Sequence, residues 1–159
     1  MSFKIIDNFL SEKEFTEIKN IVINPQFPLY YSETVASNDD SKHFYFLHKL
    51  YDKNIPLSEY VGIISSILNK VGCKSLIRSK VNCFPRTENL ITYGLHVDYD
   101  FPHKGVILYL NNCNGGTYVG DEFIQSKENR VLMFDSSKPH KNTNCTDAKC
   151  RFNIVINYF

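Results

Sequence analysis

The chain has 159 residues and a formal net charge of +1, with 43% hydrophobic and 22% charged residues. This length suits one domain with a single core, and the composition is ordinary for a globular protein. The near-neutral charge gives no indication of nucleic-acid binding, and no apolar run approaches the roughly 20 residues of a membrane span.

The five cysteines argue against a disulfide framework. Their number is odd, and no two of them form the C-x-x-C pair that is typical of zinc or redox sites. The first residues, Met1 to Lys4, lack the apolar region of a signal peptide. The sequence therefore predicts reduced thiols and a cytoplasmic protein without membrane attachment.

The N-terminal half predicts two helices and two short strands. Residues 3–9 read as an opening strand, and Ser11 with Glu14 forms a capping box that starts a helix ending before Asn24-Pro25. Residues 29–31 read as a second strand. A second helix should follow residues 55–58, because apolar residues recur at helical spacing up to Val71, and Gly72 suits its C-cap.

The segment from Ser32 to Lys42 is polar and rich in turn formers. It predicts a loop, for which two interpretations stay open. It is either a solvated connection or a mobile lid over a site, since loops on rigid scaffolds often carry function.

From residue 75 onward the pattern changes to short strands separated by turns, with no helix between them. This pattern predicts a sandwich or barrel. The expected strands cover residues 75–84, 90–98, 104–111, 117–119, 122–124, 130–134 and 151–158. We therefore expect an α+β, mainly β fold in one domain over residues 1–159, with a helical or lid part at 1–74 and a β core at 75–159.

His96 and Asp98 are the first candidate metal ligands. Two residues apart at the end of an expected strand, they point to the same side, and together they could clamp a divalent metal. The pattern alone is weak, because it occurs by chance roughly 0.3 times in a chain of this composition. His140, just after the strand at 130–134, is the best third ligand, whereas His103 lies in a turn and is expected to face solvent.

The last expected strand carries a charge on an inner face. Alternation places Phe152, Ile154, Ile156 and Tyr158 on one side and Arg151, Asn153, Val155 and Asn157 on the other. A buried arginine needs an anionic partner, and its planar fork suits a carboxylate. The partner could be a ligand, an acidic residue elsewhere in the chain, or water at the rim of the sheet.

These residues together resemble the iron(II)- and 2-oxoglutarate-dependent dioxygenases, particularly the prolyl-4-hydroxylase-like branch. That family has H-x-D, a distal histidine and a basic residue about ten positions later, here His96-Val97-Asp98, His140 and Arg151. The strand at 106–111, the Gly115-Gly116 turn and the strand at 131–134 also match in order and spacing. The resemblance runs from about residue 75 to the end and implies a double-stranded β-helix, or jelly-roll, with N-terminal helices that buttress it.

The resemblance implies a role for each matching residue. His96, Asp98 and His140 would bind Fe(II), and Arg151 would bind the distal carboxylate of 2-oxoglutarate. The remaining members of the implied co-substrate pocket are Tyr109, which would donate a hydrogen bond to the same carboxylate, and Ile107, Val155 and Tyr93.

One position departs from the family pattern. The family has Tyr-Pro on the strand before the first motif, whereas this chain has Phe84-Pro85. The missing hydroxyl implies that one contact to the co-substrate is lost or replaced by water. Asp100, which closes the same stretch, has no assigned role.

The function implied by the resemblance is hydroxylation of an unactivated C–H bond. The reaction consumes O₂ and 2-oxoglutarate and releases succinate and CO₂. The substrate would be a prolyl or other peptidyl residue of a peptide or protein, or a small molecule. The alternative is a non-catalytic jelly-roll module that binds a metal or a small carboxylate.

Overall fold

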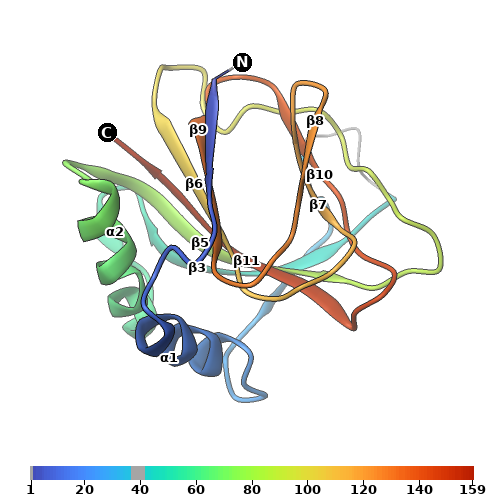
Figure 1. Cartoon of the computed structure of the whole chain (residues 1–159), viewed down its shortest axis with the longest axis horizontal. Coiled ribbons are helices and arrows are strands. Elements are labelled where there is room, and N and C mark those ends of the chain that lie inside the picture. Colours follow the sequence, from blue (N-terminus) through green and yellow to red (C-terminus); the bar gives the residue numbers. More distant parts are fainter. Residues whose placement is uncertain (1, 37–41) are drawn as a thin grey trace.

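Figure 1 shows a computed structural model of the chain, in which residues 2–36 and 42–159 are described. Two antiparallel sheets face each other. The main sheet runs in the order β1 (Phe3–Ile6), β9 (Arg130–Asp135), β6 (Lys104–Tyr109), β11 (Cys150–Tyr158), β5 (Leu76–Pro85), β3 (Tyr45–Asp52), β2 (Tyr30–Ser32), with β4 (Ile55–Pro56) paired to β3. The small sheet runs β10 (His140–Asn142), β7 (Gly116–Val119), β8 (Glu122–Gln125). The predicted mainly β jelly-roll is confirmed.

The helices α1 (Glu12–Val22) and α2 (Ser65–Val71) cover the outer face of the main sheet (Figure 1). The predicted capping box at the start of α1 is present: the Ser11 hydroxyl accepts a hydrogen bond from the Glu14 amide, and the Glu14 carboxylate accepts one from the Ser11 amide. Gly72 ends α2 in the left-handed conformation, with φ of +66°. The start of α1 and the end of α2 therefore lie where the sequence predicts them.

The second helix differs from the prediction at its beginning. Its first part is a separate 3₁₀ helix, η2 (Glu59–Ile64), whose amide at Tyr60 donates to the Ser58 hydroxyl. Gly62 and the β-branched residues around it lower the propensity for a regular α-helix. The apolar stripe still packs on the sheet, because Ile64 and Ile67 are fully buried.

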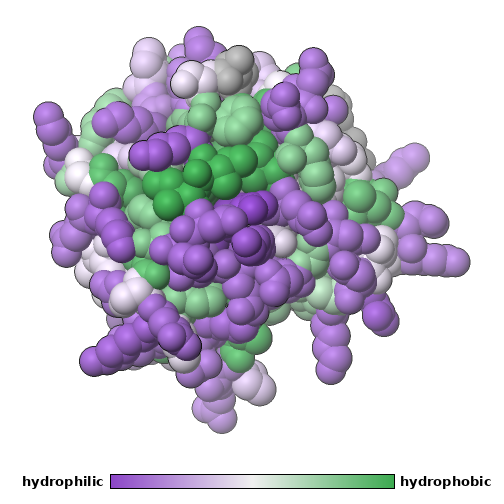
Figure 2. All heavy atoms as spheres, viewed as in Figure 1, coloured by the Kyte–Doolittle hydropathy of each residue, from purple (hydrophilic) through white to green (hydrophobic). Residues whose placement is uncertain are grey.

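Two of the three hydrophobic clusters among the described residues hold the layers together, and the third comprises Tyr45, Phe84 and Tyr93. The larger lies between the helices and the main sheet, and the smaller fills the space between the two sheets. Strand β11 contributes to both as its alternation predicts, with Ile154 and Ile156 in the first and Val155 in the second. Figure 2 shows polar residues over most of one face, with a band of apolar residues crossing its upper half.

The segment 90–98 was predicted as a strand, and this prediction is wrong. It makes only two isolated bridges, Thr92 with Thr143 and His96 with His140. The segment has a partner on one side only, and the Ile91 amide donates to the Asn144 side chain instead of to a neighbouring strand. The metal-ligand pattern therefore sits on an irregular rim segment beside the small sheet.

The remaining observations concern the cysteines, the helices and the predicted loop. All five cysteines are free thiols. Within the described ranges, no helix is long and apolar enough to cross a membrane. Of the predicted loop at 32–42, the part at 37–41 lies outside the described residues.

Asn129 ties the N-terminal segment to the main sheet. Its side chain accepts a hydrogen bond from the Leu10 amide at 2.9 Å and donates one to the Leu10 carbonyl at 2.8 Å, in a buried environment. Asn129→Ala leaves both Leu10 groups unpaired and places alanine at φ of +56°, so we expect the free energy of unfolding to fall by about 3 kcal/mol in urea titrations.

Asn8→Ala is the matched control, because Asn8 is exposed and has a similar φ of +51°. It isolates the backbone strain and should cost only about 1 kcal/mol. Equal losses in the two variants would contradict the role given to the Asn129 side chain.

Candidate metal centre

Three predicted ligands converge at the rim between the two sheets. His96 and Asp98 come from the segment 90–98, and His140 is the first residue of β10. One ligand atom from each residue lies within 4.8 Å of the other two. Main-chain hydrogen bonds fix this arrangement, because the amides of His96 and His140 each donate to the carbonyl of the other, at 3.0 and 2.9 Å. The structure thus brings the predicted triad together.

Both imidazoles are oriented to use Nε2 as a ligand atom. The Nδ1 atom of His96 lies 3.1 Å from the Gly94 carbonyl, and that of His140 lies 3.0 Å from the Lys138 carbonyl. A carbonyl can only accept, so Nδ1 carries the proton and Nε2 keeps its lone pair. Burial, followed by the neighbouring His140, lowers the pKa of His96 to about 4. The His96 ring is therefore neutral at pH 7, as a metal ligand must be.

Asp98 is held by several donors from the main sheet. One carboxylate oxygen pairs with Arg78 at 2.8 Å, and the other accepts from Ser136 at 3.0 Å and from Asn157 at 2.8 Å. Burial alone would raise the pKa of Asp98, but the Arg78 charge and the other neighbours hold it below its usual range. The carboxylate is therefore ionised and oriented, with the oxygen nearer to His140 4.0 Å from that ring's Nε2.

His103 was predicted to face solvent, and this prediction is wrong. The residue is 5% exposed, and its Nε2 lies 3.2 Å from the Asn157 amide nitrogen that donates to Asp98. Rings of Tyr99 and Phe101 pack against it, at centroid distances of 5.4 Å each. The turn folds back over the sheet, so His103 supports Asp98 through Asn157, while Asp100 is exposed.

Arg151 is fully buried on the inner face of β11. Its guanidinium donates to the Thr143 carbonyl at 2.8 Å and the Thr117 hydroxyl at 3.1 Å, and it lies over the rings of Phe84 and Tyr109. Within the described part of the chain, no carboxylate comes close enough to form an ion pair with it. Burial lowers the pKa of Arg151, which an anion beside it would oppose.

Several polar atoms around Arg151 are buried without a hydrogen-bond partner. They include the Nε of Arg151 and the hydroxyl of Tyr109. Asn82 and Asn153, which bond to each other at 2.9 Å, each keep a further unpaired atom. Buried polar atoms are rarely left unpaired, so this cluster is suited to a polar ligand with carboxylate oxygens.

A small cavity is lined by all three metal ligands and by Asn82 of this polar cluster. Its enclosed volume is about 20 Å³, room for about one water molecule, so a dicarboxylate could enter only if side chains shift. The predicted residues Ile107 and Val155 line it, whereas Tyr93 stacks behind Phe84 at a centroid distance of 5.6 Å. The wall comprises Val35, Tyr45, Lys80, Asn82, Phe84, His96, Asp98, Ile107, His140, Asn142 and Val155.

Comparison with known proteins gives matches in structure only. No protein-family model matches the sequence, and no related sequence was found among curated proteins. A prolyl hydroxylase from Trichoplax adhaerens, solved with a hypoxia inducible factor peptide, matches with a TM-score of 0.71 at 19% identity, over 99% of this chain and 83% of its own. The chain has the fold of the 2-oxoglutarate- and iron(II)-dependent oxygenases.

Other matches show the breadth of this oxygenase fold. A 2OG-Fe(II) oxygenase family oxidoreductase from Burkholderia pseudomallei matches with a TM-score of 0.71 at 13% identity, over 98% of this chain and 84% of its own. The epimerase SnoN from nogalamycin biosynthesis matches with a TM-score of 0.62 at 9% identity, over 99% of this chain and 77% of its own. Since both hydroxylases and an epimerase share the fold, the reaction has to be argued from the site.

The structure also places residues at the site that the sequence analysis did not single out. Arg78 and Lys80 on β5 share the inner face with Asn82, and Tyr45 on β3 lies beside Lys80. The sequence contains a pattern that could have identified them, because alternation along residues 75–84 puts these polar side chains on one face of a strand expected to be internal. It is the same pattern that pointed to Arg151.

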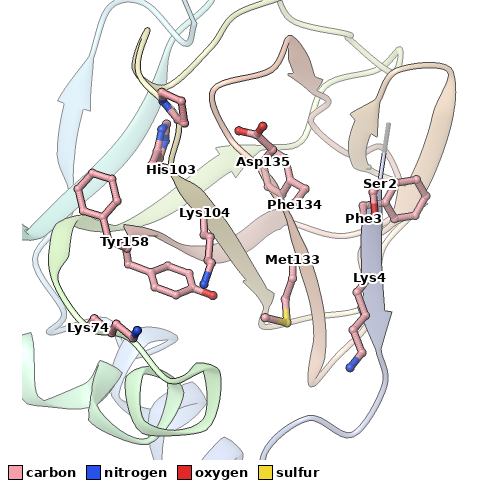
Figure 3. Close-up of a pocket in the computed structure, with 13 residues that line it drawn as sticks. Ser2, Phe3, Lys4, Lys74, His103, Lys104, Met133, Phe134, Asp135 and Tyr158 are labelled. Atoms are coloured by element: carbon pink, nitrogen blue, oxygen red, sulfur yellow. The ribbon is translucent and has the colours of Figure 1, made fainter.

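A larger groove lies along β1, β6, β9 and the end of β11, and none of the three predicted metal ligands lines it (Figure 3). Its volume is about 650 Å³, and the side chains of Lys4, Lys74 and Lys104 lie along it with Tyr158 and Met133. These lysines are exposed. Among the described residues, the one group of His, Cys, Asp and Glu side chains that could hold a metal is the His96, Asp98 and His140 triad, so the smaller cavity remains the candidate site.

Proposed function

We propose that the protein is an iron(II)- and 2-oxoglutarate-dependent oxygenase that hydroxylates an unactivated C–H bond. One observation carries the proposal: a preformed His96, Asp98 and His140 triad lies close to a buried arginine that has no acidic partner among the described residues. Two imidazoles and one carboxylate on one side of a metal are the ligand set of non-haem iron(II) oxygenases. The unpaired donors of Arg151 and Tyr109 fit the distal carboxylate of the co-substrate.

The residues of the chain would position the reactants and exclude water. The Gly94 and Lys138 carbonyls fix the two imidazoles, and Arg78 fixes the carboxylate of Asp98. When bound, iron(II) and 2-oxoglutarate supply the oxidising chemistry, in which one oxygen atom of O₂ enters the C–H bond and the other enters succinate as CO₂ leaves. The side chains of Ile107 and Val155 would pack on the carbon chain of the co-substrate.

For the substrate we propose a prolyl or other peptidyl residue, with a small molecule as the alternative. The peptide option is supported by the Trichoplax adhaerens neighbour, which was solved with a peptide fragment. The small-molecule option is supported by SnoN, which was solved with nogalamycin RO. Val35 and Tyr45 also line the cavity and would face the substrate.

The test is anaerobic loading of the purified protein with Fe(II) and 2-oxoglutarate. We expect a weak visible absorption band from the metal–co-substrate complex and a higher midpoint of thermal unfolding. After admission of air, succinate should form, and prolyl peptides are screened by mass for one added oxygen atom.

The two alternatives give different results. A band without succinate, across peptides and small molecules, would indicate a binding module without turnover. No band and no metal-dependent thermal shift would contradict the proposed function altogether.

A further inference from the structure

Lys80 is a second cation on the inner face, and the proposed cofactor binding does not use it. It lies on β5, opposite Val155 of β11 and Lys49 of β3, and lines the same cavity as the three metal ligands. Its amino group lies 3.3 Å from the Tyr45 hydroxyl and 5.6 Å from the centre of that ring. In the described ranges, no carboxylate forms an ion pair with it.

The environment of Lys80 is unfavourable for an isolated charge. Burial, followed by the positive charge of Arg78, lowers the pKa of Lys80 to about 8. Asp98 and Asp52 are the acids whose charges act on Lys80, but Asp98 is already paired with Arg78 and would be a metal ligand, and Asp52 is paired with Lys49. A cation kept in such a position without an acid is suited to an anionic ligand.

The charges around the loaded site indicate that Lys80 binds the substrate rather than the co-substrate. Around the site, the four cations Arg78, Lys80, Arg151 and Lys49 outnumber the carboxylates of Asp98 and Asp52, which pair with Arg78 and Lys49. Iron(II) and dianionic 2-oxoglutarate cancel each other, so their binding leaves this excess of positive charge unchanged. Both carboxylates of 2-oxoglutarate would also have partners already, because Arg151 would bind one and the metal would bind the other.

We propose that Lys80, positioned by the Tyr45 hydroxyl, binds a carboxylate of the primary substrate, which makes the substrate a free acid or an acidic peptide segment. The inference rests on the proposed function and specifies its substrate class. Lys80 reaches toward Tyr45, which lines the cavity together with Val35. A carboxylate bound there would lie close to the metal, so the oxidised C–H bond would lie a few atoms from the acid group.

The test compares acids with their own amides. Protein loaded anaerobically with Fe(II) and 2-oxoglutarate is titrated calorimetrically with free amino acids, with blocked peptides containing Asp or Glu, and with the amide of each. We expect at least one acid to bind about tenfold more tightly than its amide, as for a charge-assisted hydrogen bond. If the acid binds more tightly than its amide among the free amino acids, the substrate is a free acid. If this preference occurs among the peptides, the substrate is an acidic peptide segment.

Lys80→Met should remove the acid preference and leave the affinity for 2-oxoglutarate within about twofold. Lys49→Met is the matched control: it removes the same charge from the neighbouring strand, where Lys49 is exposed and paired with Asp52, and should retain the preference. Thermal unfolding of both variants monitors the fold.

Each other outcome overturns the inference. If no acid binds better than its amide, or if Lys80→Met keeps the preference, Lys80 is not the carboxylate-binding residue. If Lys80→Met instead lowers the affinity for 2-oxoglutarate tenfold, Lys80 binds the co-substrate. Absence of the visible band in the unaltered protein overturns the proposed function, and this inference with it, whereas a band without acid preference overturns the inference alone.

Discussion

Arg151→Met is expected to weaken 2-oxoglutarate binding about a hundredfold, equivalent to about 3 kcal/mol, and to leave Fe(II) affinity within a few-fold. The guanidinium is held by the Thr143 carbonyl and the Thr117 hydroxyl, which leaves its Nε and the nearby Tyr109 hydroxyl for the distal carboxylate. Methionine keeps much of the volume and removes the charge. Titration of the visible band of the Fe(II)-loaded protein with 2-oxoglutarate measures the effect.

Tyr109→Phe provides the matched comparison, because it removes one donor to the same group and no charge. It should weaken 2-oxoglutarate about tenfold, as expected for a single hydrogen bond. If 2-oxoglutarate binds Arg151→Met as tightly as the unaltered protein, the co-substrate pocket has been placed wrongly.

Asp98→Ala should abolish metal binding and also destabilise the fold. The carboxylate is the ion-pair partner of Arg78, and the two side chains are 9% and 17% exposed. Its removal leaves a largely buried cation unpaired, so we expect the free energy of unfolding to fall by about 3 kcal/mol. Calorimetric titration with Fe(II) and urea unfolding of the metal-free protein separate the two effects.

Two further variants test this reasoning. Asp98→Asn keeps an oxygen that can accept from Arg78, so it should lose most of the metal affinity and less of the stability. Asp100→Asn removes the same charge two residues further on, at an exposed position, and should change neither quantity. Tight Fe(II) binding by Asp98→Ala would remove Asp98 from the metal centre.

Local signals in the sequence were sufficient for several ends of elements and for two of the three triad residues. The capping box at Ser11, the C-cap at Gly72 and the alternation of β11 depend on neighbouring residues, and the structure contains all three. His96 and Asp98 could be paired because residues two apart in an extended segment point to one side. His140 was selected from its place just after the strand at 130–134, and the family resemblance then supported it, since nothing local shows which segments meet.

The errors concern features that depend on tertiary packing. The segment 90–98 is extended but lacks a second neighbour, so it forms bridges instead of a strand. His103 is buried because its turn folds back onto Asn157, a contact between residues 54 positions apart. Lys80 has the pattern of an inner-face residue, but only the structure shows that, among the described residues, no carboxylate forms an ion pair with it.

The two main-chain hydrogen bonds between His96 and His140 have a consequence for how a metal would enter and leave. They are a large part of what holds the segment 90–98 to β10, because that segment is not otherwise part of a sheet. A metal held by all three ligands would add a further crosslink between the same two segments. Separation of the rim from β10 would then dismantle the coordination site while the main sheet stays folded, so metal exchange and local opening would be one event.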